Sequence, residues 1–432
     1  MLSSIRRVGF WFLDAAKGGV VRSHYKDIKH HMDNHVPNYN SLNEILMHAV
    51  KTTEFYSLCD ANDILSFPVI NKNIIRENYS KIFSSAYIGK PLHTVSTSGS
   101  TGTPFSLEWD IGKRKRQLAD LIYFNEKAGH KLGEPYMYFR VWTSKNNKSR
   151  LGRLIHNVTP IDIRNLDDTT FETIRARLKR GREKTCIGYA STYEFLAKYL
   201  QELGDSPKDF RAKSFITSSE VMTTEVKQMI MDTVGCSIAD RYSNEENGFL
   251  AQAYGTSEQF EVNCASFYME ILKEDADEPA EIGELGRIVI TDLFNHAMPI
   301  IRYDTGDLAM KSAEIDGWVT SINSIKGRRA DVMYDTSGNK ITSHAWGVYM
   351  KEFDKLKQYQ IVQETAFEYT INLNGAAPHY DDDSILNFLR SILGSSAVIK
   401  ICHVESIPTL ASGKFKRAIC NYIYDESNYI SE

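Results

Sequence analysis

The sequence lacks a long apolar run and a strong excess of charge of either sign. Its 432 residues contain 51 lysines and arginines against 55 aspartates and glutamates, so the formal net charge is −4. A protein that binds nucleic acid generally carries a basic surface to meet the phosphates, and we therefore expect no nucleic-acid partner. Asp14 and Lys17 interrupt the opening apolar stretch, and no other run is long enough to span a bilayer. We expect a cytoplasmic protein without a transmembrane segment.

Close cysteine pairs are also absent. The six cysteines are scattered along the chain without a CxxC spacing. This pattern favours reduced thiols and argues against a zinc site. The neighbours Cys402 and His403 are most simply a strand residue and the residue beside it.

The opening segment allows two interpretations. Trp11 and Phe12, preceded by two arginines, could let a helix at this point touch a membrane surface. Alternatively, Phe10, Phe12 and Leu13 pack against the core of the protein. We favour the packing interpretation.

The order of β-rich and helical patterns predicts an α/β protein of several parts. A chain of 432 residues exceeds what one hydrophobic core usually organises. Between about residues 85 and 300, strands alternate with helices, and two of the helices are predicted to begin at capping boxes formed by Thr169 and Ser191. This alternation predicts a large N-terminal domain of helix-covered, largely parallel sheets. Strands are predicted at 92–97, 186–189, 214–217 and 237–241, and a helix at 113–127.

The pattern changes in the later part of the chain. Strands at 267–272 and 286–291 belong to a hairpin-rich region, which predicts a β-rich subdomain. The last hundred residues contain a helix at 383–393 between strands at 366–373 and 397–404, which predicts a small α+β C-terminal domain. We place the domains at 1–326 and 327–432.

A run of hydroxyls and glycines follows the strand at 92–97. Glycines let backbone N–H groups approach phosphate oxygens closely, and the hydroxyls supply further donors. No Gly-Lys-Ser/Thr follows, so the run is not the P-loop of nucleotide hydrolases. A flexible surface loop explains it about as well. The residues are Thr97, Ser98, Gly99, Ser100, Thr101 and Gly102, followed by Thr103 and Pro104.

Two further segments contain groups suited to a nucleotide. Tyr242 could present a flat face to an adenine ring, and the Glu246 carboxylate could hold Mg²⁺, which prefers oxygen ligands. A strand end followed by an acidic helix N-terminus explains the same acidic run. Asp307 follows a glycine and could accept hydrogen bonds from both hydroxyls of a ribose, although a plain turn explains its segment too.

Two basic segments lie near the predicted domain boundary and near the end. Residues 325–331 include Arg328, and residues 408–417 include Lys414 next to Gly413. A lysine on a glycine-containing loop of a mobile domain can bring a point charge to a reaction centre and leave again. Basic surface residues without such a role are the more common explanation of either segment alone.

Taken together and in this order, the five segments resemble the adenylate-forming superfamily of acyl-CoA synthetases, peptide-synthetase adenylation domains and luciferases. The likeness is greatest to its phenylacetate–coenzyme A ligase-like branch, which includes relatives linked to capsular polysaccharide biosynthesis. It extends over roughly residues 97 to 417. The supporting phrases are Thr97–Pro104, Gly188–Ser191, Ser218–Glu220, Tyr242–Glu246, Pro299–Asp307, Gly327-Arg328 and Ser412–Lys414.

This resemblance implies a role for each candidate residue, with ATP and Mg²⁺ as cofactors and CoA as a further one. The 97–102 run grips the β- and γ-phosphates, Tyr242 stacks on adenine, and Glu246 binds Mg²⁺. Asp307 holds the ribose hydroxyls with help from Arg328. The implied catalytic residues are Glu246 and Lys414, the latter bridging the attacking carboxylate and the α-phosphate. The small domain is implied to be mobile, with a hinge around Arg329–Asp331.

The chain departs from the family pattern at three places. Phe105 stands where many members have a lysine. Glu245 stands where a Ser or Thr usually precedes the magnesium glutamate, which leaves the choice between Glu245 and Glu246 as main metal ligand open. Ala330 and Asp331 replace the usual acidic pair at the hinge.

The implied function is ATP-dependent activation of a small-molecule carboxylic acid to an acyl-adenylate, with release of pyrophosphate. The acyl group then passes to the thiol of CoA or to an amine, such as that of an amino sugar or nucleotide sugar in capsule or O-antigen assembly. The alternative is a non-catalytic nucleotide-binding relative of the same fold. The presence of both Asp307 and Lys414 argues against that alternative.

Overall fold

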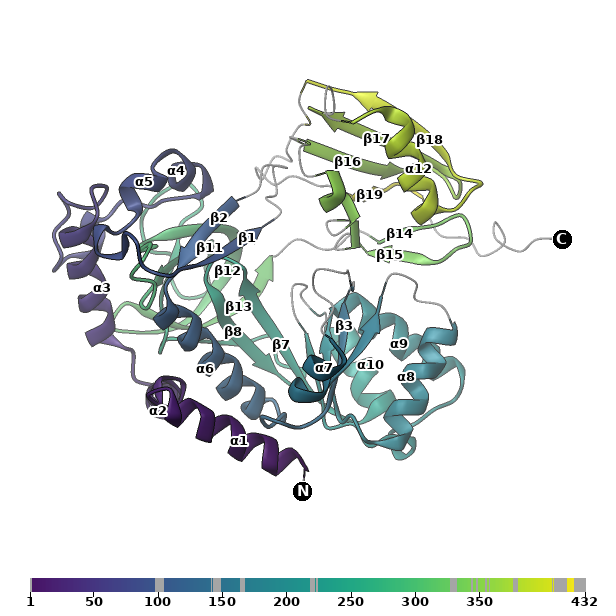
Figure 1. Ribbon diagram of the computed structural model, residues 1–432, viewed down its shortest axis with the longest axis horizontal. Coiled ribbons are helices and arrows are strands. Elements are labelled where there is room, and N and C mark those ends of the chain that lie inside the picture. The colour runs from purple at the N-terminus through teal and green to yellow at the C-terminus, as the bar shows by residue number, and fades with distance from the viewer. Residues whose placement is uncertain are drawn as a thin grey trace.

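The structure is a computed structural model, which describes most of the chain (Figure 1). The described residues are 2–97, 105–140, 142, 149–163, 168–217, 222, 224–326, 332–342, 345–346, 349–353, 356, 358–375, 380–405, 407 and 418–422. The helices are α1 (Leu2–Ala16), α2 (Val20–Asp33), α3 (Tyr39–Thr52), α4 (Lys72–Glu77), α5 (Tyr79–Ile82), α6 (Ile111–Lys127), α7 (Arg150–His156), α8 (Asp168–Arg180), α9 (Ala190–Glu202), α10 (Thr224–Val234) and α12 (Asp382–Leu393), with short 3-10 turns at Ile64–Ser66, Ser85–Tyr87, Pro207–Asp209 and Met350–Phe353.

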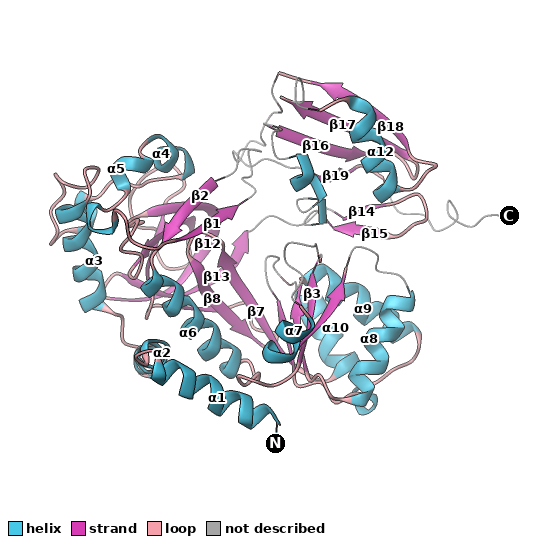
Figure 2. Ribbon diagram, viewed as in Figure 1, coloured by secondary structure: helices cyan, strands magenta, loops and turns pink. Residues whose placement is uncertain are grey.

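Strands make up the centre of the larger part of the molecule (Figure 2). The strands are β1 (His93–Thr97), β2 (Phe105–Trp109), β3 (Tyr136–Arg140), β4 (Val158–Asp162), β5 (Thr185–Gly188), β6 (Ser214–Thr217), β7 (Ser237–Asn244), β8 (Gly248–Tyr254), β9 (Phe260–Val262), β10 (Phe267–Leu272), β11 (Leu285–Asp292), β12 (Tyr303–Ile315), β13 (Trp318–Lys326), β14 (Val332–Tyr334), β15 (Lys340–Thr342), β16 (Gln358–Gln363), β17 (Glu368–Asn374), β18 (Val398–His403) and β19 (Ala418–Cys420).

One mixed sheet organises the larger part of the chain. Its eleven strands run in the order β10-β11-β12-β13-β9-β8-β7-β6-β5-β3-β4. The pairings from β4 to β7 are parallel, and those from β7 to β10 are antiparallel. The predicted α/β class is confirmed. The β-rich region predicted after about residue 265 is the antiparallel half of the same sheet, and β7 joins the two halves.

The C-terminal elements form a smaller α+β unit, drawn at the upper right of Figure 1. Its four-stranded sheet has the order β18-β17-β16-β19, and α12 covers it with Ile385, Leu389 and Leu393 buried. Asp381 caps α12 by accepting a hydrogen bond from the Ser384 N–H, and Gly394 ends the helix with a φ of 99°. The predicted boundary at residue 326/327 stays a prediction, because residues 327–331 lie outside the described part of the chain.

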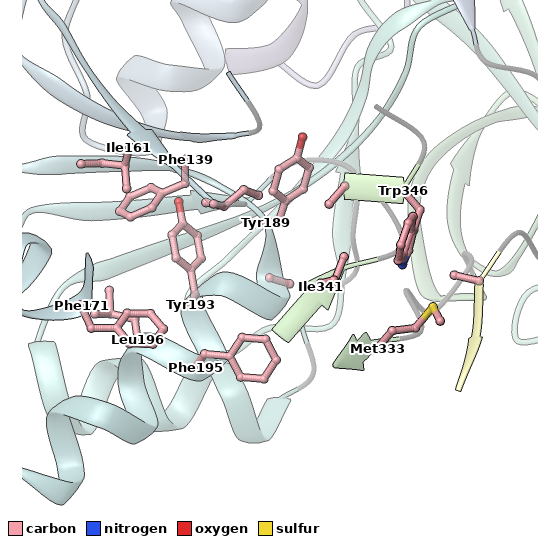
Figure 3. Close-up of a cluster of buried hydrophobic side chains, with 14 of the residues drawn as sticks. Phe139, Ile161, Phe171, Tyr189, Tyr193, Phe195, Leu196, Met333, Ile341 and Trp346 are labelled. Atoms are coloured by element: carbon pink, nitrogen blue, oxygen red, sulfur yellow. The ribbon is translucent and has the colours of Figure 1, made fainter. Parts of the chain in front are cut away.

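A single apolar cluster connects this smaller unit with the parallel half of the large sheet (Figure 3). Tyr189 and Phe195 contribute from the large part, and Ile341 and Trp346 contribute from the smaller unit. All four are buried. The two units therefore share hydrophobic packing.

The first helix is oriented differently from the favoured prediction. Phe12 and Leu13 of α1 are 72% and 59% exposed, so the prediction that they pack on the core is wrong. Phe10 and Trp11 do pack against a core cluster. The cause is Asp14, which is buried and accepts hydrogen bonds from the backbone N–H groups of the next helix, α2. These bonds fix the rotation of α1 and leave Phe12 and Leu13 outside.

Candidate active site

Tyr242 and Asp307 lie side by side although 65 residues separate them in the chain. The Tyr242 hydroxyl on β7 donates a hydrogen bond to Asp307 Oδ2 at 2.9 Å and lies 3.4 Å from Thr305 Oγ1. Burial raises the pKa of Tyr242 well above its usual value, and the Asp307 carboxylate adds to the rise. The tyrosine therefore remains protonated and donates to the carboxylate. The residues predicted to hold adenine and ribose meet at one point.

An irregularity in β12 sets the position of Asp307. Asp304 pairs with Val289 and Leu308 with Arg287, so residues 305–307 lie opposite a single residue of β11. Gly306 adopts a φ of 77°, and its N–H donates to Asp304 Oδ1 at 2.8 Å. Such bulges re-aim side chains and are common next to active sites. The predicted turn is thus a bulge inside a strand.

Glu246 is held in the short turn between β7 and β8. Its side chain is nearly buried; its Oε1 forms an ion pair with Lys72 and lies 3.4 Å from the Tyr303 hydroxyl. Burial raises the pKa of Tyr303 well above its usual value, and the Glu246 carboxylate adds to the rise. The backbone carbonyl of Glu246 accepts a hydrogen bond from Trp109 Nε1 at 3.0 Å. The alternative of an acidic helix N-terminus is wrong, because strands flank this run on both sides.

The Glu246 carboxylate suits a metal ion that is completed by phosphate oxygens. The contacts with Lys72 and Tyr303 both involve Oε1 of this carboxylate. Among the described residues, no group of three or more His, Cys, Asp or Glu side chains could enclose a metal. Mg²⁺ is commonly bound through one or two carboxylates together with substrate phosphates. Glu245, by contrast, is exposed, so the geometry favours Glu246 over its neighbour.

The ends of the hydroxyl-rich run lie close to Glu246. Thr97 at the end of β1 pairs with Phe105 at the start of β2. Lys72 Nζ lies 5.5 Å from the centre of the Phe105 ring and is also the ion-pair partner of Glu246. The base of the run and the candidate metal ligand therefore share a neighbour. Ser98 to Gly102, Arg328 and Lys414 lie outside the described residues, as does the side chain of Thr97, and their roles stay predictions.

Sequence reasoning missed Lys72, Trp109 and Tyr303 at this site. Tyr303 belongs to the Arg302–Asp307 segment that had been singled out, so its place in the motif was a usable signal. Lys72 lies on the short helix α4, far in sequence from every motif. Nothing in the spacing of the motifs points to it.

Comparison with known proteins shows that the chain is similar to acid–CoA ligases. Residues 333–421 match a family model described as the CapK C-terminal domain. Over 384 residues the chain is 22% identical to a phenylacetate–coenzyme A ligase of Pseudomonas putida. This alignment covers 84% of this chain and 85% of that ligase. It is 24% identical over 180 residues, 40% of each chain, to a ligase of the same name from Thermus thermophilus. These findings support the predicted resemblance to the phenylacetate–coenzyme A ligase-like branch of the adenylate-forming superfamily.

The fold of this protein is also that of a solved acid–CoA ligase. A 2-hydroxyisobutyryl-CoA ligase, in complex with 2-HIB-AMP and CoA, aligns with a TM-score of 0.56 at 17% identity. The alignment covers 89% of this chain and 88% of that one. The likeness concerns the fold.

In the part of the chain that the structure describes, no helix combines the length and apolar character needed to cross a membrane.

Proposed function

We propose that the protein uses ATP and Mg²⁺ to activate a carboxylic acid as an acyl-adenylate and then transfers the acyl group to CoA. The observation that carries the proposal is the contact between Tyr242 and Asp307. It unites, in one place, a flat ring suited to adenine and a carboxylate suited to ribose hydroxyls. The curated relatives, which are named as acid–CoA ligases, support the same reaction.

In this proposal the nucleoside is bound between β7 and β12. Asp307 accepts hydrogen bonds from the ribose, and carboxylates form stronger hydrogen bonds of this kind than neutral acceptors do. The Tyr242 hydroxyl holds the carboxylate in position. Its ring is the surface on which adenine stacks.

The phosphates are then directed toward Glu246 and the residues that follow Thr97. Mg²⁺ held there would neutralise phosphate charge. The Glu246 carboxylate would hold the metal, and its Oε1 also contacts Tyr303 and Lys72. The backbone N–H groups and hydroxyls of residues 98–102 grip the β- and γ-phosphates.

The chemical step joins two anions. An oxygen of the substrate carboxylate attacks the α-phosphorus, a new P–O bond forms, and the bond to the leaving pyrophosphate breaks. We assign to Lys414 the neutralisation of the negative charge that develops in the transition state. Electrostatic stabilisation of this kind usually accounts for a large part of the rate enhancement. Rotation of the small C-terminal unit between the two half-reactions would carry Lys414 away and admit the acceptor. We place the reaction in the cytoplasm.

ATP–pyrophosphate exchange measured over a panel of aromatic, fatty and amino acids tests the activation step. We predict that Lys414→Ala abolishes exchange with the acid that the wild type accepts, because the attacking and developing charges lose their counter-charge. ATP binding should remain largely intact, and the neighbouring Lys416→Ala variant should exchange normally. Normal exchange by Lys414→Ala would refute the assigned role. ATP binding without exchange on any acid would favour the non-catalytic alternative.

The match of residues 333–421 to the CapK C-terminal domain supports a second candidate for the acceptor. This candidate is an amine, such as that of an amino sugar or nucleotide sugar in polysaccharide assembly. Once an acid is known, release of AMP is measured with CoA and with amino sugars. Release that depends on CoA supports a thioester product, and release that depends on the amine supports an amide.

A further inference from the structure

α1 presents an apolar face to solvent. Its large side chains Leu2, Ile5, Val8, Phe12 and Leu13 are between 59% and 72% exposed. The helix lies along the outer edge of the molecule, at the bottom of Figure 1. Exposing this many large apolar side chains on one helix is unfavourable in water. A contiguous exposed apolar face of this kind marks a surface that binds another protein or a membrane.

The rest of the molecule holds this face outward. Asp14 is buried and accepts hydrogen bonds from the N–H groups of Val21 and Arg22 at 3.1 and 3.0 Å. Near the start of the helix, a Cβ added at Gly133 would lie 2.7 Å from the Ser3 carbonyl oxygen, so the two backbones are in close contact. Both contacts would break if α1 rotated to bury its apolar side. The exposure is therefore a property of the fold.

The charges around the face identify its occupant. Within α1, whose residues Leu2–Ala16 are all described, the single acidic side chain is that of the buried Asp14. Arg6 and Arg7 lie on the same helix, and Lys17 and Arg22 follow it as exposed residues. An apolar face bordered by arginine and lysine is the pattern of a helix that lies in an anionic membrane interface.

The dimensions of α1 argue against a second copy of this chain as the occupant. Its 15 residues make a strip about 22 Å long at 1.5 Å per residue and about 10 Å wide. Stable interfaces between proteins bury about 800 Å² on each partner. A helix face of this size provides much less.

We propose that α1 binds the surface of an anionic membrane, with Leu2, Ile5, Phe12 and their apolar neighbours entering the headgroup region. The basic side chains beside the face contact the lipid phosphates. Binding is peripheral and does not depend on the proposed enzymatic activity.

Co-sedimentation of the full chain with vesicles tests the proposal. We expect binding to vesicles that contain phosphatidylglycerol, weaker binding to pure phosphatidylcholine, and loss of the difference at high salt. Ile5→Asp combined with Phe12→Asp should lower the partition coefficient at least about tenfold, because two apolar anchors are replaced by anions. The matched control is Leu58→Asp, which changes a leucine that is 99% exposed elsewhere on the surface and should bind as the wild type does.

A second measurement keeps the helix face apolar and so avoids a loss of folding caused by the aspartates. Brominated phosphatidylglycerol should quench a tryptophan placed in the exposed face by Phe12→Trp, seen as the difference between this variant and the wild type, whose Trp11 packs against a core cluster. Absence of both sedimentation and quenching would overturn the proposal. Dimerisation of the wild type in light scattering, abolished by the double aspartate variant, would overturn it in favour of a second copy.

Discussion

Lys72 contacts both parts of the candidate phosphate site, which are Glu246 and the base of the hydroxyl-rich run. Its ammonium pairs with Glu246 and lies over the Phe105 ring, at the base of the hydroxyl-rich run. A cation in this place has two consequences. It adds positive charge where phosphates are proposed to bind, and it competes with Mg²⁺ for the Glu246 carboxylate.

We predict that Lys72→Met lowers the Mg²⁺ concentration needed for half-maximal pyrophosphate exchange. The ion pair is partly exposed, with 27% of the Lys72 side chain accessible. It therefore contributes about 1 kcal/mol, which corresponds to about a fivefold shift in the Mg²⁺ requirement. Lys72→Arg, which keeps the charge, is the control. An unchanged requirement in Lys72→Met would exclude competition between the lysine and the metal.

A second residue-scale prediction concerns His130. It is buried, lies 3.2 Å from Thr185 Oγ1, and meets the Tyr136 ring edge-on. Burial lowers its pKa to about 4. In the unfolded chain the pKa returns to about 6.5, so between these values the unfolded state binds the extra proton and stability falls as the pH is lowered.

Replacing His130 should therefore reduce the loss of stability in acid. The full effect of this group is about 3 kcal/mol between about pH 6.5 and about pH 4. We expect the unfolding free energy of His130→Gln, measured in urea, to vary less with pH than that of the wild type. Burial also lowers the pKa of His24 to about 4, so part of the slope persists. Identical slopes in the two proteins would contradict the assignment.

At the scale of elements, much of the secondary structure follows from local sequence. The strands predicted at 214–217 and 267–272 have the predicted bounds, and the helix predicted at 383–393 begins one residue earlier. Thr169 and Ser191 lie inside α8 and α9 rather than at their N-caps. β2 was missed because its stability depends on pairing back with β1 across the run at 98–104, a contact that no local pattern encodes.

The orientation of α1 and the neighbourhood of Glu246 likewise depend on contacts between elements, which local sequence patterns do not encode. The sequence left two interpretations of this helix open, membrane contact or packing on the core, and the Asp14 contacts with α2 decide which side chains are buried. Tyr242, Glu246 and Asp307 were predicted as site residues because each belongs to a local motif, and their roles stay predictions. Lys72 could not be predicted, since its contact with Glu246 is 174 residues distant and depends on how α4 docks.

The packing of β10 on β11 gives a prediction about a single glycine. A Cβ at Gly286 would lie 2.3 Å from the carbonyl oxygen of Leu272. Gly286→Ala must displace the backbone of one strand, and we expect it to destabilise the protein by about 1–3 kcal/mol in urea unfolding. Gly9→Ala is the control, because that site has no atom within 4 Å and lies in a helix, where alanine is favoured by up to about 1 kcal/mol. Equal stabilities of the two variants would contradict the strand-packing argument.

At the scale of the whole molecule, Trp346 lies in the apolar cluster shared by the two units. It is fully buried, and its Nε1 has no hydrogen-bond partner among the described residues. Trp346→Ala removes most of this packing and should cost about 3–5 kcal/mol. Trp346→Phe keeps most of the volume and removes the unpaired N–H group, so its cost should stay below about 1.5 kcal/mol.

Calorimetry distinguishes shared packing from independent domains. Because one cluster joins both units, we expect the wild type to unfold in a single transition, which Trp346→Ala shifts as a whole to lower temperature. Two resolved transitions, of which the substitution moves one, would indicate that the contact contributes little to cooperativity.

Strand β7 occupies a special place in this molecule, since within the large sheet it has a parallel neighbour on one side and an antiparallel neighbour on the other. An amide proton of β7 that is bonded to β6 or β8 exchanges with deuterated solvent when β7 opens from that neighbour. Deuterium uptake along β7 therefore reports separation of the two halves of the sheet. Because Tyr242 lies near the end of β7, binding of a nucleotide at the proposed site should also change the uptake along this strand.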